Sequence, residues 1–166
     1  MANCSVQYSL PGYPRYYLVD DAEVHVVASG GPQDRAILGL YPDRALVLFE
    51  GDCTPEPVYT RIRDLAAAGS LPTIKNVLLD FTQFTGMIDW EFAKSRDKRA
   101  WGNLCPEKCA YVMRDKAAVM IAKGLVAFVV ETECGIFLSH AEAFRWLGWD
   151  EREFDADDFA SASAAS

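Results

Sequence analysis

The stretch Asn76-Val77-Leu78-Leu79-Asp80-Phe81 decides the fold of this 166-residue chain. Its short, mostly apolar run is typical of a strand that is buried on both faces of a sheet. Further apolar stretches follow at 109–113 and 135–138, and a segment with helical signals comes after each of the three. Because strands that alternate with helices form parallel sheets through crossover connections, we expect an α/β fold. We expect its sheet to be mixed, with parallel central strands at 76–81, 109–113 and 135–138 and with helices packed on it.

Four helices are expected, each opened by a residue that can cap its first turn. These residues are Thr54, Asp89, Asp115 and Ser139, which open helices over about 54–68, 89–101, 116–132 and 139–147. Glu142 lies three residues after Ser139 and completes a capping box. Gly69 and Gly148 follow the first and the last helix, where glycine commonly ends a helix.

The beginning of the chain favours β-structure. Residues 24–28 form a short apolar strand, and 36–41 and 44–50 flank the turn Pro42-Asp43 as a hairpin. We expect one domain over 1–149, in which 1–40 is an N-terminal β extension. The segment 150–166 is acidic and rich in Ala and Ser, which predicts a disordered tail; the alternative is a peptide that docks on a partner.

Composition excludes several classes of protein. Half of the residues (51%) are apolar and 24% are charged, as in a globular domain rather than a disordered chain. The net charge of −8 argues against a nucleic-acid binder, which needs a basic surface. No signal peptide is recognised, and the longest apolar stretch, 117–130, is shorter than the roughly 20 residues that span a bilayer. We therefore expect a cytoplasmic protein, and its five cysteines, an odd number, to be reduced thiols.

No pattern of residues predicts catalysis, a metal or a cofactor. His25 and His140 lack the nucleophile and acid of a hydrolytic triad nearby in the sequence. A pair of Cys134 and His140 is one alternative, but a buried thiol and a surface histidine are favoured. Cys105 and Cys109 have no second Cys or His pair that would complete a zinc site, and no glycine-rich phosphate loop occurs. We expect a protein that is not an enzyme and needs no cofactor.

Six stretches share patterns of strand, turn and aromatic anchor with one known family. They are 46–51, the helix start 54–56, 77–81, 86–89, 108–112 and 141–147. From about 41 to 149 the sequence resembles the SpoIIAA-like proteins, small α/β domains also described as STAS-like or Sec14-like. The resemblance implies a non-catalytic regulatory or protein-interaction module.

The resemblance also bears on phosphorylation. STAS-type anti-sigma factor antagonists carry a phosphorylatable serine at the start of the helix after the central strand. Trp90 stands at about that position here, so the resemblance implies no phosphate switch at this turn. Thr82 and Thr85, just upstream, are the alternative sites of modification, although threonine in such a loop commonly bonds to the local backbone.

The helix expected from Asp89 to Trp101 carries a basic stripe in an otherwise acidic protein. The stripe consists of Lys94, Arg96, Lys98 and Arg99, whereas Trp90, Ala93 and Trp101 should pack inward. One interpretation is a site for an anion or an acidic partner, and the other is a solvated helix face.

The helix expected over 116–132 is apolar nearly all round. Its inward face would hold Ala118, Ile121, Ala122, Leu125, Phe128 and Val129, and its second face Val119, Met120, Val126, Ala127 and Val130. A helix of this kind is buried on both sides. The second face should therefore meet another copy in a homodimer, an unknown protein partner or the N-terminal arm. The alternative is a small carrier that binds an apolar or lipid-like ligand against this helix.

Overall fold

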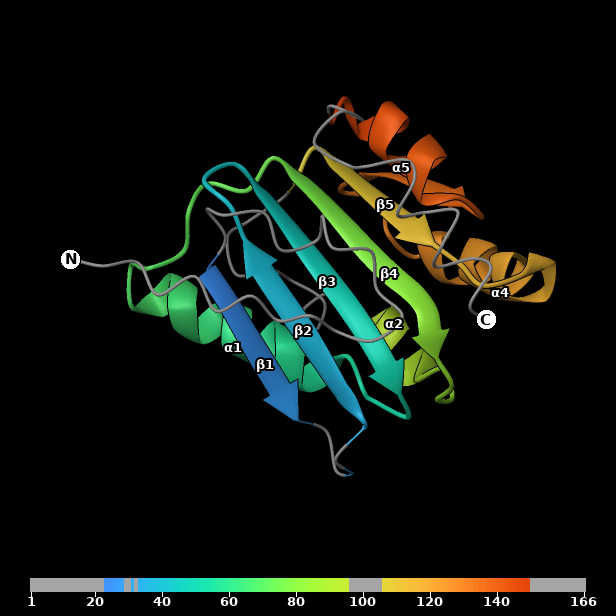
Figure 1. Ribbon diagram of the computed structural model, residues 1–166, viewed down its shortest axis with the longest axis horizontal. Coiled ribbons are helices and arrows are strands. Elements are labelled where there is room, and N and C mark those ends of the chain that lie inside the picture. The colour runs from blue at the N-terminus through green and yellow to red at the C-terminus, as the bar shows by residue number, and fades with distance from the viewer. Residues whose placement is uncertain (1–22, 29–30, 32, 96–105, 150–166) are drawn as a thin grey trace.

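The computed structural model describes residues 23–28, 31, 33–95 and 106–149. Six strands form one sheet, and their order across the sheet is their order along the chain (Figure 1). They are β1 (Glu23–Ala28), β2 (Arg35–Leu40), β3 (Arg44–Gly51), β4 (Asn76–Phe84), β5 (Lys108–Val112) and β6 (Glu133–Phe137). The pairs from β1 to β3 are antiparallel and those from β3 to β6 are parallel. The predicted mixed α/β sheet, with its N-terminal hairpin, is confirmed.

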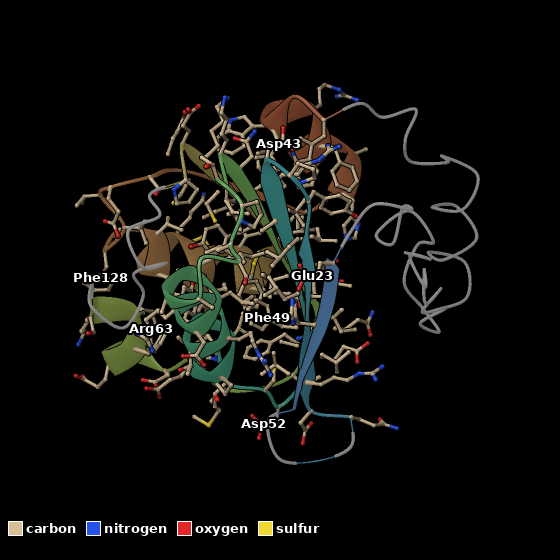
Figure 2. All side chains as sticks on the ribbon, turned by 90° about the vertical axis from the view of Figure 1, so that its left-hand side faces the viewer. Glu23, Asp43, Phe49, Asp52, Arg63 and Phe128 are labelled. Carbon is tan, nitrogen blue, oxygen red and sulfur yellow. The ribbon has the colours of Figure 1, made fainter. Side chains whose placement is uncertain are left out.

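Helices cover both faces of the sheet. They are α1 (Glu56–Ala67), α2 (Trp90–Lys94), α4 (Lys116–Val126) and α5 (His140–Leu147). The parallel strands follow one another in a single direction, so right-handed crossovers place α1, α2 and α4 on the same face. Helix α5 comes after β6 and lies on the other face. Figure 2 shows the sheet nearly edge-on, with Phe49 between α1 and the strands.

Successive side chains along each strand point to opposite faces of the sheet, so each face has its own core. On the α1 face, Val58 and Ile62 of α1 pack with Val47, Val77 and Leu79 of the central strands. On the opposite face, the buried residues of α5 pack with Leu78 and its neighbours on β3 and β5; they are Ala143, Phe144 and Leu147. Successive residues of β4 thus contribute to opposite cores, as a strand buried on both faces requires.

A β-bulge interrupts the pairing of β3 with β4. Leu48 lies opposite Asp80, but Glu50 lies opposite Gln83, so β4 has one extra residue here. A bulge of this kind reverses the alternation beyond it. Phe84 therefore packs in the same core as Phe81, three residues earlier, and both rings lie on the α1 face.

The ends of α1 and α2 correct two expectations. Pro55, and not Thr54, occupies the N-cap of α1, without a side-chain capping bond. Helix α2 ends at Lys94 because Ser95 is extended and its amide closes the last turn; serine favours such ends over helix interiors. Asp89, Asp115 and Ser139 accept bonds from the first turns of their helices, as predicted.

Helix α4 is shorter than the expected 116–132. It ends at Val126, and the amides of Phe128 and Val129 turn back to the carbonyls of Leu125 and Val126. Gly124 and the β-branched residues at 129–130 have low helix propensities, which explains the early end. In the described part of the chain, no helix has the length and apolar character needed to cross a membrane. The expected acidic tail at 150–166 and residues 1–22 of the N-terminal extension lie outside the described residues.

Candidate functional site

A cavity of about 80 Å³ lies on the α1 face at the carboxyl ends of β3 and β4. Its floor is formed by the sheet, its walls by α1 and α4, and its cover by α2 and the loop before it. The described lining residues are Phe49, Cys53, Pro55, Tyr59, Leu79, Phe81, Phe84, Met87, Ile88, Asp89, Phe92, Ala93, Tyr111, Leu125 and Val129. The cavity reaches the surface at Met87, which is 90% exposed. This lining is mainly apolar, as in pockets for small molecules.

Three aromatic rings on neighbouring strands form the floor. The ring of Phe81 on β4 stacks on that of Phe49 on β3, with 4.5 Å between centroids and 12° between planes. Tyr111 on β5 lies on the other side of Phe81 at 6.2 Å, and the two planes differ by only 4°. Phe84, which the bulge brings to this face, meets Phe81 edge to face at 5.5 Å. The floor is thus a row of nearly parallel rings.

Helix α2 packs closely on α4 at the cover of the cavity. A methyl group added at Gly124 would lie 3.3 Å from the Trp90 ring, so glycine permits the close approach of the two helices. The inward packing expected for Trp90 is wrong, because its ring is partly exposed beside Gly124. Ala93, also expected to pack inward, is buried.

The ionisable groups of the cavity are mostly neutral at pH 7. Burial raises the pKa of Cys53 to about 11, and burial also raises the pKa of Tyr111 well above its ordinary value. Asp89 is the carboxylate among the described lining residues, and it accepts a hydrogen bond from the Phe92 amide at 2.9 Å. No Lys or Arg occurs among those lining residues.

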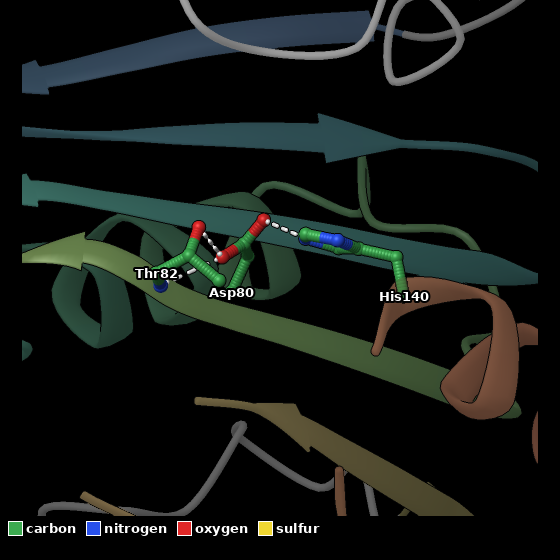
Figure 3. A network of polar contacts seen from close by, with 3 residues as sticks. All are labelled: Asp80, Thr82 and His140. Atoms are coloured by element: carbon green, nitrogen blue, oxygen red, sulfur yellow. Dashed lines mark hydrogen bonds and ion pairs between the residues drawn. The ribbon is translucent and has the colours of Figure 1, made fainter. Parts of the chain in front are cut away.

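Behind the floor, on the opposite face of β4, lies a fully buried carboxylate. Asp80 Oδ2 contacts His140 Nε2 at 2.8 Å, and Asp80 Oδ1 accepts bonds from Thr82 N at 2.8 Å and Thr82 Oγ1 at 2.6 Å (Figure 3). Thr82 lies at the bulge, between the β4 residues that pair with Leu48 and Glu50, and Asp80 accepts a hydrogen bond from its amide. Burial raises the pKa of Asp80, but the bonds from His140 and Thr82 outweigh it and hold that pKa below its ordinary value.

The interpretation of His140 as a surface histidine is wrong. Its side chain is 16% exposed and reaches from the first turn of α5 to β4. Cys134, the alternative partner, is partly buried, and its Sγ donates to the carbonyl of Thr132 at 3.5 Å. Sequence spacing missed the true partner because Asp80 and His140 are 60 residues apart. The one signal was a lone carboxylate inside the apolar run 76–81, which requires a partner when buried.

The second face of the helix at 116–132 is only partly exposed. Met120 is 66% and Val130 87% exposed, whereas Val119 and Val126 are half-buried. On the expected inward face, Ala122 is buried and Leu125 and Val129 line the cavity. Ile121 and Phe128 were expected there too, and this is wrong, because both are exposed. For Phe128 the reason is that the helix ends at Val126.

Of the four residues in the basic stripe, Lys94 is the one that the structure describes. Lys94 is exposed, and its Nζ lies 3.7 Å from Glu91 Oε1. Arg96, Lys98 and Arg99 lie outside the described residues, so the site for an anion or acidic partner stays a prediction. Among the residues that the structure describes, no group of three or more His, Cys, Asp or Glu side chains is placed to hold a metal ion.

Comparison with known proteins finds a similar fold among solved structures. No protein-family model matches the chain, and neither does any curated protein sequence. Among solved structures, the chain is similar to an uncharacterised protein of the DUF3478 family from Shewanella loihica, which is described as having a SpoIIAA-like fold. The two are 17% identical with a TM-score of 0.44, and the match covers 77% of this chain and 96% of the other.

Proposed function

We propose that the protein is a non-catalytic binding domain that holds a small apolar ligand in the cavity under α2. The observation that carries this proposal is the aromatic and aliphatic lining of the cavity, which reaches the surface at Met87. Its position supports the proposal, because open α/β sheets bind ligands at the carboxyl ends of their parallel strands. The acid–base pair Asp80–His140 lies on the opposite face of the sheet, away from this cavity.

Filling the cavity tests the proposal. Toluene and methylcyclohexane serve as neutral probes, with binding measured by NMR titration of the isotope-labelled protein. Leu125→Trp places a larger side chain in the space that the probe would occupy, so we expect binding to weaken by about 10-fold or more.

The matched control lies on the same helix. Met120 is exposed and does not line the cavity, so Met120→Trp should leave the affinity for both probes unchanged. Equal affinity of the Leu125→Trp variant and the natural protein would contradict the proposed site. Failure of both probes to bind the natural protein would contradict the proposed function.

A second candidate is an interaction module that forms a homodimer through the second face of the helix and the residues after it. The exposure of Met120 and Val130 supports it, since exposed apolar patches often mark protein contacts. A regulatory role, as the SpoIIAA-like resemblance implies, belongs to this candidate.

Introducing a charge on this face tests the dimer. The Met120→Asp substitution would place an unpaired carboxylate in a desolvated interface. The cost in association free energy is on the order of several kcal/mol, similar to that of breaking a buried ion pair. We expect a monomer by light scattering with an unchanged circular dichroism spectrum. Lys123→Glu, an exposed position on the same helix, is the control and should keep the dimer. A natural protein that is already monomeric would remove this candidate.

A further inference from the structure

The floor of the cavity presents ring edges, not ring faces, to the space above it. Phe49 and Phe81 stand on neighbouring strands, and their centroids are 4.5 Å apart with nearly parallel planes. This separation matches the spacing of adjacent strands, about 4.8 Å, so the ring planes stand upright across the row of strands. The edges of such rings point away from the sheet, toward α2 and α4, where the cavity lies.

Ring edges carry partial positive charge and ring faces partial negative charge. A flat aromatic ring can lay its face over these edges, as Phe84 and Phe81 already meet at 84° within the lining. A saturated chain gains burial in the cavity but lacks this electrostatic attraction. The floor therefore distinguishes between two apolar ligands of the same size.

We infer that the cavity selects an uncharged ligand with a single aromatic ring, whose face covers the edges of Phe81 and Tyr111, the two partly exposed rings of the row. This inference rests on the proposed function and names the ligand class for the same site.

The size of the cavity supports one ring. An apolar cavity of about 150 Å³ is known to enclose benzene completely. The present cavity has about 80 Å³, so its volume limits the ligand to a single ring. A long acyl chain has no room in this volume.

The charges around the cavity support a neutral ligand. The thiol of Cys53 and the hydroxyl of Tyr111 remain protonated at pH 7, because burial raises the pKa of each. The acidic side chain among the described lining residues is that of Asp89, which is exposed. An anionic ligand would lose its hydration and meet this carboxylate, with no cation among the described lining residues to compensate.

The test compares how one substitution changes the binding of two matched probes. Toluene and methylcyclohexane have similar shapes but differ in hydration, so their absolute affinities are not compared. Phe81→Leu keeps an apolar side chain at the floor and removes the ring. We expect the Kd of toluene to rise about 2- to 10-fold more than that of methylcyclohexane, the range for a lost aromatic contact.

Two further variants make the comparison decisive. Phe137→Leu removes a ring that packs against Trp146 on the opposite face, so it should change the two Kd values equally. Tyr111→Leu, at a half-buried position of the same row of rings, gives the same comparison as Phe81→Leu if that variant does not fold.

A second pair of probes tests the charge. Benzyl alcohol and benzoate share the ring, and we expect benzoate to bind at least about 10-fold more weakly because its carboxylate must be desolvated. Benzoate binding as tightly as benzyl alcohol would overturn the inference. So would equal changes in the Kd of toluene and methylcyclohexane, although both probes would then still bind and the proposed function would stand. Only the failure of every probe to bind would remove both.

Discussion

Replacing His140 with alanine is expected to destabilise the folded protein by about 3 to 5 kcal/mol, the cost of breaking a buried pair by removing one partner. Asp80 is fully buried, and its Oδ2 would lose the contact at 2.8 Å. Thr82 would remain the donor to Oδ1, leaving half of the carboxylate without its present partner. Urea denaturation followed by circular dichroism measures the free energy of unfolding.

The second histidine of the chain supplies the matched control. His25 Nε2 also lies 2.8 Å from a carboxylate, Glu23 Oε1, and its side chain is 19% exposed, close to the 16% of His140. Glu23, however, is 59% exposed, and pairs with an exposed partner contribute about 1 kcal/mol or less. His25→Ala should therefore cost under about 1 kcal/mol. Equal losses in the two variants would show that Asp80 does not depend on His140.

The effect of His140→Ala should depend on pH. In the natural protein the pKa of Asp80 is lowered, so its contribution to stability is present above the unfolded-state pKa, about 3.9, and is lost as pH falls through the lower folded-state pKa. Without His140, burial dominates and raises the folded-state pKa of Asp80. Protonation then relieves the buried charge, so the difference in stability should shrink as pH falls from 7 toward 4. A constant difference over this range would contradict the assignment.

Phe144→Ala is expected to have a similar effect, a loss of about 3 to 5 kcal/mol, typical of truncating a buried phenylalanine. Phe144 is a fully buried residue of α5, and its ring stacks on Trp149 with centroids 5.6 Å apart. The substitution leaves a cavity between α5 and the sheet. Thermal and urea denaturation measure the loss, and hydrogen exchange should show faster exchange of the α5 amides than of the α1 amides.

An exposed phenylalanine serves as the control for this truncation. Phe128 follows α4 and is exposed, so Phe128→Ala should cost less than about 1 kcal/mol. Phe144 lies on the face opposite the ligand cavity, so the variant should keep its affinity for toluene at temperatures where it is folded. A loss of binding in the folded variant would show that α5 supports the cavity directly.

The sequence predicted the type of the elements and their order along the chain well because these depend on local patterns. The apolar run at 76–81 lies within β4, and Asp89, Asp115 and Ser139 cap the helices that they were expected to open. Capping needs only the neighbouring residues, so it can be recognised without the fold. Helix ends were less predictable. Gly124 and the residues after it have low helix propensities, but a low propensity ends a helix only where tertiary packing does not compensate for it.

The candidate site was harder to predict than the fold because it depends on contacts between distant residues. The row of Phe49, Phe81 and Tyr111 arises from the register of three strands, and the bulge that adds Phe84 leaves no mark in the sequence. The ligand was expected against the second face of the helix, at Val119, Met120, Val126 and Val130, and none of these is among the described lining residues. Leu125 and Val129 do line the cavity, but they were expected on the inward face that packs on the sheet. The partner of Asp80 required knowledge of where α5 packs.

The order of the strands bears on how the chain can fold during its synthesis. Because each strand pairs with its neighbour in the sequence, the sheet can grow by one edge strand at a time as the ribosome releases the chain. Asp80 is an exception: it enters the centre of the sheet with β4, but its partner His140 is made 60 residues later. A nascent chain that ends before α5 therefore holds six strands and a carboxylate without its histidine. Docking of α5 then completes the Asp80 pair and covers its face of the sheet in one late step.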